Sequence, residues 1–130
     1  MTSALVREQA LEIAERIDTV GPVTVKRLFG GAGLFAQGIM FAMMIRGSLY
    51  LRVDAASRAK LEALGAKPFS YATRSKTVTV ASFYEAPGEV VEDSDELGRW
   101  AIAALSAAKA AAEHKATKSR KAGAKRKPRQ

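Results

Sequence analysis

Eight positively charged side chains in the last sixteen residues are the clearest chemical feature of the sequence. They are Lys115, Lys118, Arg120, Lys121, Lys125, Arg126, Lys127 and Arg129, and no acidic residue follows Glu113. Closely spaced Lys and Arg residues can neutralise phosphates and release counterions, which gives affinity for nucleic acid without reading its base sequence. We therefore expect residues 115–130 to hold DNA or RNA non-specifically, and a terminus that only aids solubility is the alternative.

The rest of the chain carries no net charge. Residues 1–114 contain 13 Lys and Arg and 13 Asp and Glu, so the whole formal charge of +8 belongs to residues 115–130. The last ten residues add Gly123 and Pro128 to these cations, a composition that favours disorder. The sequence thus predicts one folded domain over residues 1–114 and a basic, disordered tail over residues 115–130, called the tail below.

Residue types suited to catalysis are scarce. His114 is the only histidine, it lies near the expected end of the last helix, and the only acid beside it is Glu113. Nucleophilic catalysis needs a base that a third group orients and a nucleophile within its reach. Because the sequence offers no such set, we expect no enzymatic activity and assign no catalytic residue.

Metal and cofactor sites are not expected either. The chain has no cysteine, which excludes disulfides and thiolate metal ligands. An acidic run, comprising Glu85, Glu89, Glu92, Asp93, Asp95 and Glu96, lacks the residue spacing of a calcium-binding loop. We interpret the run as a solvated loop that leads into a helix start, where acidic side chains favour the positive end of the helix dipole.

Three closely spaced glycines invite comparison with a phosphate-binding loop. Gly33 and Gly38 have the spacing of such a loop, but Ile39 and Met40 stand where it requires Lys and Ser or Thr. We therefore expect Gly30, Gly31 and Gly33 to mark a bulge, or a bend where two backbones approach closely.

The elements that position these residues follow from hydrophobic periodicity and from turn signals. The sequence predicts a helix over residues 3–20, strands over 23–29, 33–36, 39–45 and 48–53, a helix over 54–64, strands over 69–72 and 76–83, a loop over 85–93, and a helix from about Ser94 that frays near Lys118. The expected fold class is α+β, in which an antiparallel sheet of about five to six strands packs with helices. Gln37-Gly38 and Arg46-Gly47 suit tight hairpin turns.

The strand patterns also predict which side of the sheet is buried. Leu49, Leu51 and Val53 alternate with Ser48, Tyr50 and Arg52, so a helix should cover the first set, and the second should be at least partly exposed to water. The strand over 39–45 is apolar on both sides, alternating along its length. It is therefore either central in the sheet and covered on both sides, or part of a homodimer interface. Lys26, Arg46, Tyr50, Arg52, Arg74 and Lys76 also suggest a weak resemblance to an RNA-binding sheet face.

One stretch resembles the N-terminal domain of the TfoX/Sxy family. The matching residues are Arg27, Phe29, Gly30, Gly31, Gly33, Met40, Phe41, Leu49, Tyr50 and Leu51, followed by Pro68-Phe69, Tyr71, residues 82–85, Pro87 and a helix bearing Trp100. The resemblance covers roughly residues 10–108. It implies a small α+β domain with helices on one antiparallel sheet, and a role in regulating gene expression, including competence for DNA uptake. Full-length members of that family carry a second helical domain, and here the tail stands in its place.

Taken together, these features predict a non-enzymatic regulatory domain that acts through contacts with an unknown protein partner. The tail adds non-specific affinity for nucleic acid. A protein-binding adaptor with no role at nucleic acid is the alternative. Charged residues such as Arg7 and Glu8 interrupt the N-terminal apolar residues, and glycines interrupt the uncharged run over residues 28–45, so we expect a cytoplasmic protein without a membrane span.

Overall fold

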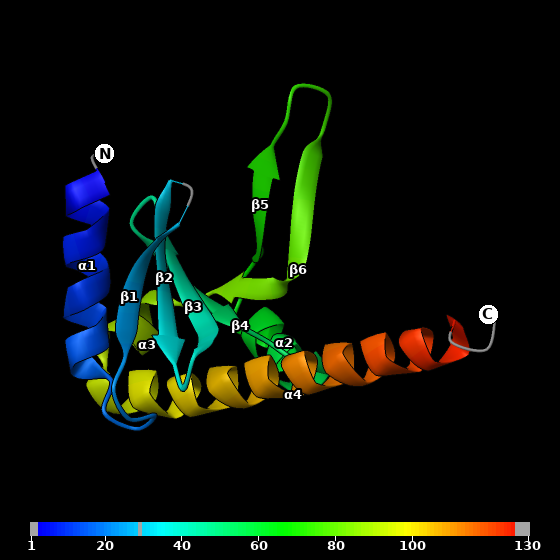
Figure 1. Ribbon diagram of the computed structural model, residues 1–130. Helices are drawn as coiled ribbons and strands as arrows, with labels where there is room; N and C mark the ends of the chain where they lie inside the picture. The colour runs from blue at the N-terminus through cyan, green and yellow to red at the C-terminus, as the bar shows by residue number, and fades with distance from the viewer. Residues whose placement is uncertain (1–2, 29, 127–130) are drawn as a thin grey trace.

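The structure is a computed structural model that describes residues 3–28 and 30–126, with side chains for residues 5–28 and 30–114. Its elements, labelled in Figure 1, are α1 (Ser3–Arg16), β1 (Thr24–Leu28), β2 (Gly31–Ala36), β3 (Ile39–Ile45), β4 (Ser48–Arg52), α2 (Ala55–Ala63), β5 (Pro68–Ala72), β6 (Thr77–Glu85), α3 (Gly88–Glu92) and α4 (Ser94–Arg126). The expected α+β class is confirmed, with one open sheet of six antiparallel strands in the order β1-β2-β3-β4-β6-β5.

Two tight turns connect the central strands as the sequence predicts. Gln37 and Gly38 have φ angles of 54° and 76°, and Arg46 and Gly47 have φ angles of 51° and 83°. Two consecutive residues with positive φ form the turn whose twist matches that of paired strands. Each glycine therefore occupies a conformation that costs other residues energy.

Helices α1 and α4 cover one face of the sheet (Figure 1). Leu49 and Leu51 of β4 point into this layer, where they are 3% and 1% exposed, whereas Ser48, Tyr50 and Arg52 are half-buried on the opposite side. Leu97, Ala101, Ala104, Leu105 and Ala108 form the buried stripe of α4. The predicted alternation of β4 is confirmed. Trp100 of α4 is only partly buried.

The central strand β3 departs from simple alternation at Phe41. Leu34 of β2 lies opposite Ala42, and Phe35 lies opposite Met40, so Phe41 is an extra residue without a partner on β2. Such a bulge shifts the register by one residue. Consequently Phe41 and Ala42 both join the core beneath the helices, while Met40 and Met43 contact the cluster on the other face.

The other face of the sheet, called the open face below, is partly covered by the sheet itself. Strand β6 pairs with β4 only through residues 83–85 and with β5 mainly through residues 77–80, and between these segments it bends. Residues 68–81 thus form a hairpin that stands away from the other strands, called the arm below (Figure 1). Phe69 of the arm packs with Phe83, Met43 and Ile45, which explains why β3 is apolar on both sides.

Several boundaries differ from the sequence prediction. The first helix ends at Arg16 and not near Val20, although Ile17 and Val20 remain in the core. The expected loop over residues 85–93 contains the short helix α3, in which Val90 is 2% exposed and its amide donates to the Pro87 carbonyl at 3.0 Å. The burial of Val90 stabilises this single helical turn. A helix of five residues is too short to show a hydrophobic periodicity in the sequence.

The last helix also extends further than expected. Its backbone is helical to Arg126, whereas the sequence places the end near Lys118. Alanine and lysine have high helix propensity, and that preference accounts for the extension without any packing. The disorder predicted for the tail stays a prediction, and residues 127–130 lie outside the described part of the chain.

Candidate functional site

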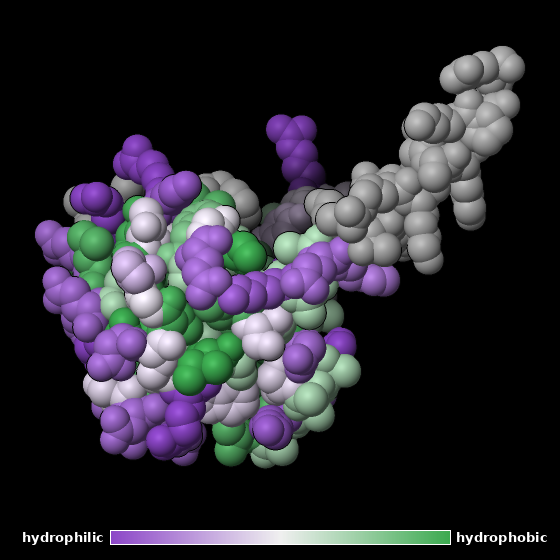
Figure 2. All heavy atoms as spheres, turned by 60° about the horizontal axis from the view of Figure 1, so that its bottom comes forward, coloured by the Kyte–Doolittle hydropathy of each residue, from purple (hydrophilic) through white to green (hydrophobic). Residues whose placement is uncertain are grey.

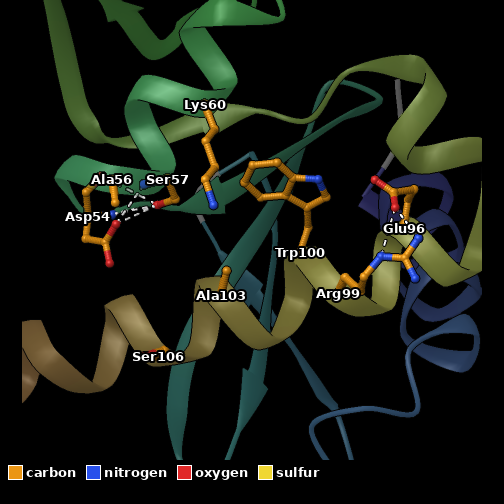
Figure 3. A pocket seen from close by; sticks show the side chains of 9 residues that line it. All are labelled: Asp54, Ala56, Ser57, Lys60, Glu96, Arg99, Trp100, Ala103 and Ser106. Atoms are coloured by element: carbon orange, nitrogen blue, oxygen red, sulfur yellow. Dashed lines mark hydrogen bonds and ion pairs between the residues drawn. The ribbon is translucent and has the colours of Figure 1, made fainter.

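A groove of about 390 Å³ lies between α2 and the first half of α4 (Figure 3). It is lined by Asp54, Ala56, Ser57, Lys60, Glu96, Arg99, Trp100, Ala103 and Ser106. Its size falls within the range of small-molecule sites. Binding of a ligand there depends on whether the polar groups of the groove are free or are occupied by contacts with each other.

Asp54 and Ser57 at one end of the groove form a reciprocal cap for α2. The Ser57 amide donates to Asp54 Oδ1 at 2.8 Å, and the Asp54 amide donates to Ser57 Oγ at 2.9 Å. The hydrogen bond from the Ser57 amide, followed by that from its hydroxyl, lowers the pKa of Asp54 below its usual value of 3.8. Both side chains are thus engaged in starting the helix.

Replacing Asp54 with alanine should lower the free energy of unfolding by about 1 kcal/mol at pH 7, because the Ser57 amide and the Ser57 hydroxyl lose the carboxylate that accepts from them. The folded state lowers the pKa of Asp54. The stabilisation by the Asp54 carboxylate is therefore complete above the pKa of the aspartate in the unfolded chain, about 3.9, and it disappears as pH falls through the lower pKa of Asp54 in the folded protein. Urea unfolding at pH 7 and near pH 2 checks this. An equal difference between the Asp54→Ala variant and the parent at both pH values would contradict it.

The remaining polar groups of the groove offer little chemistry. Arg99 Nε donates to Glu96 Oε2 at 2.9 Å, which pairs two of the charges. Among the described residues, Lys60 and Ser106 have no hydrogen-bond partner, and Trp100 bridges two core clusters. The groove can therefore contribute one ammonium group, one hydroxyl group and the face of an indole.

The three glycines have a structural role. A Cβ added at Gly31 would lie 2.4 Å from the Met44 carbonyl oxygen, so the backbones of β2 and β3 approach too closely for any side chain. Gly33 lies in the same strand, where a Cβ would meet Met40 Sδ at 2.8 Å. The predicted close approach of two backbones is confirmed. The segment is a strand and does not open a helix, so it lacks the amide cradle of a phosphate loop.

The acidic run starts α4, as the sequence predicts. Asp93 Oδ1 accepts hydrogen bonds from the amides of Asp95 and Glu96 at 3.0 and 3.2 Å. Within the described ranges, no three His, Asp or Glu side chains gather in a way that could hold a metal ion. His114 is exposed on α4.

The tail residues are placed only in part. The backbone of α4 carries Lys115, Lys118, Arg120, Lys121, Lys125 and Arg126, and the side chains of these positions lie outside what the structure describes. Lys127 and Arg129 lie outside the described residues altogether. The structure therefore shows neither which of these cations come together nor what they contact.

Charge in the neutral domain is segregated between segments of the chain. Residues 24–85, which include all six strands, contain nine Lys and Arg against three Asp and Glu. Residues 1–23 and 86–114, which include α1, α3 and the start of α4, contain four Lys and Arg against ten Asp and Glu. The strand-bearing segment is therefore the basic part of a domain whose total charge is zero.

Two cations of the open face lie over aromatic rings. Lys26 Nζ is 4.9 Å from the centre of the Phe35 ring, and Arg52 Cζ is 5.5 Å from that of Phe83. Tyr50 meets Phe69 edge to face, with ring centres 5.1 Å apart. These contacts occupy three of the six residues that suggest an RNA-binding face. Arg74 and Lys76 lie instead at the end of the arm.

A second cavity, of about 440 Å³, separates the arm from the turn between β3 and β4. Its lining is Gly30, Ile45, Arg46, Phe69 and Tyr71. Tyr71 is 42% exposed, and its ring lies 6.0 Å from that of Phe69. The cavity is mainly apolar, with the Arg46 side chain as its one charged group.

Sequence reasoning missed both the groove and the cavity, because each depends on elements far apart in the chain. One signal for the arm is nevertheless present. No acidic residue occurs between Glu62 and Glu85, whereas Lys67, Arg74 and Lys76 do. A strand pair whose charged residues are all basic indicates a surface suited to acidic partners.

The exposed surface on the α4 side shows no extended apolar area. In Figure 2, hydrophobic residues form separate spots among hydrophilic ones on this side. Ile102, at 50% exposure, is the one large apolar residue of α4 that is strongly exposed among the described positions. Nor does any helix in the described part of the chain have the length and apolarity needed to cross a membrane.

The architecture defines a small α+β domain with helices on one face of an open antiparallel sheet. Residues 15–108 match the TfoX N-terminal domain, and the chain belongs to that family. The chain is also similar to the DNA transformation protein TfoX1 of Aliivibrio fischeri, with 31% identity over 67 residues. The aligned region is 52% of this chain and 32% of that relative, so the chain spans about a third of the relative's length.

Proposed function

We propose that the chain is a non-enzymatic regulatory protein that acts in the cytoplasm through protein contacts made by its folded domain. Its tail adds non-specific affinity for nucleic acid. The observation that carries this proposal is the extent of the family match, which covers residues 15–108 and leaves the cations of residues 115–130 outside. The family domain and the net charge thus belong to different parts of the chain.

Two further observations support a regulatory role rather than a chemical one. The polar side chains of the α2–α4 groove mostly bond to each other, as in the Asp54–Ser57 cap and the Glu96–Arg99 pair. A relative is named for DNA transformation, which supports a role in competence or in the control of genes for it. Non-specific attraction to DNA would raise the local concentration of such a regulator near its site of action.

The proposal is tested by the binding of a labelled DNA duplex to two full-length proteins. One is the natural chain, and the other, called the tail-neutral variant below, has all eight tail cations replaced by glutamine. We expect the natural chain to bind and the variant to lose binding while keeping the same melting temperature. Equal affinities of the two proteins would overturn the assignment of nucleic-acid binding to the tail.

The second candidate function is a protein-binding adaptor with no role at nucleic acid. The zero net charge of residues 1–114 favours it, because a neutral domain alone has little general attraction to polyanions. This candidate predicts no binding of duplex DNA at about 0.1 M salt by either protein. The mass of the chain in solution, measured alongside, shows whether a second copy is one of its protein partners.

A further inference from the structure

We propose that the outer edge of β5 binds an acidic, extended segment of a partner protein, which joins the sheet as a seventh strand beside the arm. This inference rests on the proposed function, because it names the surface and the partner chemistry for the protein contact. Three features of the structure support it: the hydrogen-bonding edge of β5, the charge around that edge and the adjoining cavity.

Strand β5 offers free backbone groups along one side. It is the last strand in the sheet order, so only β6 pairs with it. In antiparallel strands, successive residues direct their N–H and C=O groups alternately to the two sides. The Thr73 amide donates to the Lys76 carbonyl inside the hairpin, so the groups of Ser70 and Ala72 point away from β6. Ser70, Tyr71 and Ala72 are all exposed.

The two edges of the sheet differ in their protection. Strand β1 contains Lys26 and Arg27 within its five residues, and α1 packs beside it. Charged residues and a covering helix are common protections against the addition of another strand. Strand β5 has a proline only at its first position, residues 69–72 carry no charge, and Tyr71 remains 42% exposed. The β5 edge is therefore the one open to a partner.

The charge around this edge selects an acidic partner. Lys67 precedes β5, Arg74 and Lys76 follow it, and Arg46 lies across the cavity, whereas the arm has no acidic residue. A partner strand with alternating acidic and apolar residues would place carboxylates near these cations. It would also direct apolar side chains toward the cavity beside Tyr71. Backbone pairing then supplies affinity, and the cavity supplies side-chain selectivity.

The same charges disfavour a second copy of the chain on this edge. Any antiparallel pairing of two β5 strands brings the Lys67 end of one copy to the Arg74 end of the other, where like charges repel. The acidic run of the chain itself, residues 85–96, is already folded into β6, α3 and α4. The partner segment therefore comes from another protein.

Single-stranded nucleic acid fits the edge less well than a peptide. Sheet platforms for RNA stack bases on two or three aromatic side chains. Here Phe69 is only 4% exposed and Tyr50 packs edge-on against it, which leaves Tyr71 as the one strongly exposed ring near the cavity in the described chain.

The test uses the tail-neutral variant, because the natural tail would itself attract acidic peptides. The probe is a fluorescent peptide of about ten residues that alternates valine and glutamate, a usual strand length. The controls are a valine–lysine peptide and an oligothymidylate. We expect the valine–glutamate peptide to bind best and to protect the amides of Ser70 and Ala72 from hydrogen exchange. Preference for either control, protection at another surface, or no binding would overturn the inference.

Two pairs of variants separate backbone pairing from charge. Ser70→Pro removes the outward amide at a position where edge strands tolerate proline, and Ser70→Thr keeps that amide. We expect Ser70→Pro to weaken peptide binding about fivefold and Ser70→Thr to leave it nearly unchanged. Arg74→Glu should weaken binding, whereas Arg7→Glu on α1 makes the same charge change far from the arm and should have less effect. Equal effects within both pairs would contradict the assignment.

These outcomes are independent of the DNA experiment. Peptide binding that maps to a surface other than β5 would overturn this inference and leave the proposed function standing. Retention of duplex binding by the tail-neutral variant would overturn the role of the tail in the proposed function and leave the β5 result intact.

Discussion

Replacing Gly31 with alanine lowers the free energy of unfolding by about 3 kcal/mol, at the upper end of what overpacking costs a core. The added Cβ would lie 2.4 Å from the Met44 carbonyl oxygen and 2.9 Å from Ile45 Cγ1. The nearer atom belongs to the backbone of β3, so it cannot move aside without disturbing the pairing of β2 and β3. Because whole domains are stable by only about 5 to 15 kcal/mol, this single methyl group removes a large share.

Two other glycines serve as controls for this substitution. At Gly33 the new Cβ would meet Met40 Sδ at 2.8 Å and Phe35 Cε1 at 3.0 Å, which belong to side chains. A methionine can adapt, so we expect Gly33→Ala to cost about 1 kcal/mol. At Gly88 nothing lies within 4 Å, and Gly88→Ala should change stability by less than about 0.5 kcal/mol. Urea unfolding followed by circular dichroism checks the order, and a Gly31→Ala variant as stable as Gly88→Ala would contradict it.

Replacement of the eight tail cations by glutamine should weaken duplex DNA binding at least about a hundredfold at 0.1 M salt. The physical reason is the loss of counterion release, which supplies nearly all of non-specific affinity. The control is a variant in which three cations of the strand-bearing segment, Lys26, Arg27 and Arg46, are replaced by glutamine. This control should retain most of the affinity. A larger loss in the control than in the tail-neutral variant would place the binding on the sheet.

The salt dependence of the natural chain gives a second check on the same prediction. If all eight cations meet phosphates, the logarithm of affinity falls against the logarithm of salt with a slope of at most about −7. An increase from 50 to 200 mM salt would then reduce affinity by up to about 10⁴-fold. A slope near zero in this plot would mean that the cations of the tail do not contact phosphates.

The sequence predicts the local features of the fold well. Glycine at Gly38 and Gly47 identifies the two tight turns, and the alternation along Ser48–Arg52 identifies which side of the sheet is buried. Each of these features depends on a few neighbouring residues. That is why they can be read before any tertiary contact is known.

Features that depend on distant residues could not be predicted in this way. The bulge at Phe41 appears only through its pairing with Leu34 and Phe35, and the bend of β6 appears only through its change of partner from β5 to β4. The bend creates the arm and thereby the cavity beside Tyr71. Neither the hydrophobic periodicity nor the turn residues indicate which strands pair with each other.

Charge illustrates the same limit for the candidate site. The sum over residues 1–114 is zero, and this sum alone does not indicate where charge gathers in the domain. The topology instead separates a basic strand-bearing segment from acidic α1, α3 and the start of α4. The net charge is therefore informative about the tail, whereas the basic character of the arm is visible only in the distribution of charge between Glu62 and Glu85.

The central claim is that nucleic-acid affinity belongs to the tail and that the folded domain contributes little of it. The most direct measurement is the salt slope of duplex binding by a synthetic peptide of residues 115–130, compared with that of the full chain. We predict that the two slopes agree within about one unit, since both report the same released counterions. A peptide slope near zero beside a steep slope for the full chain would contradict the claim.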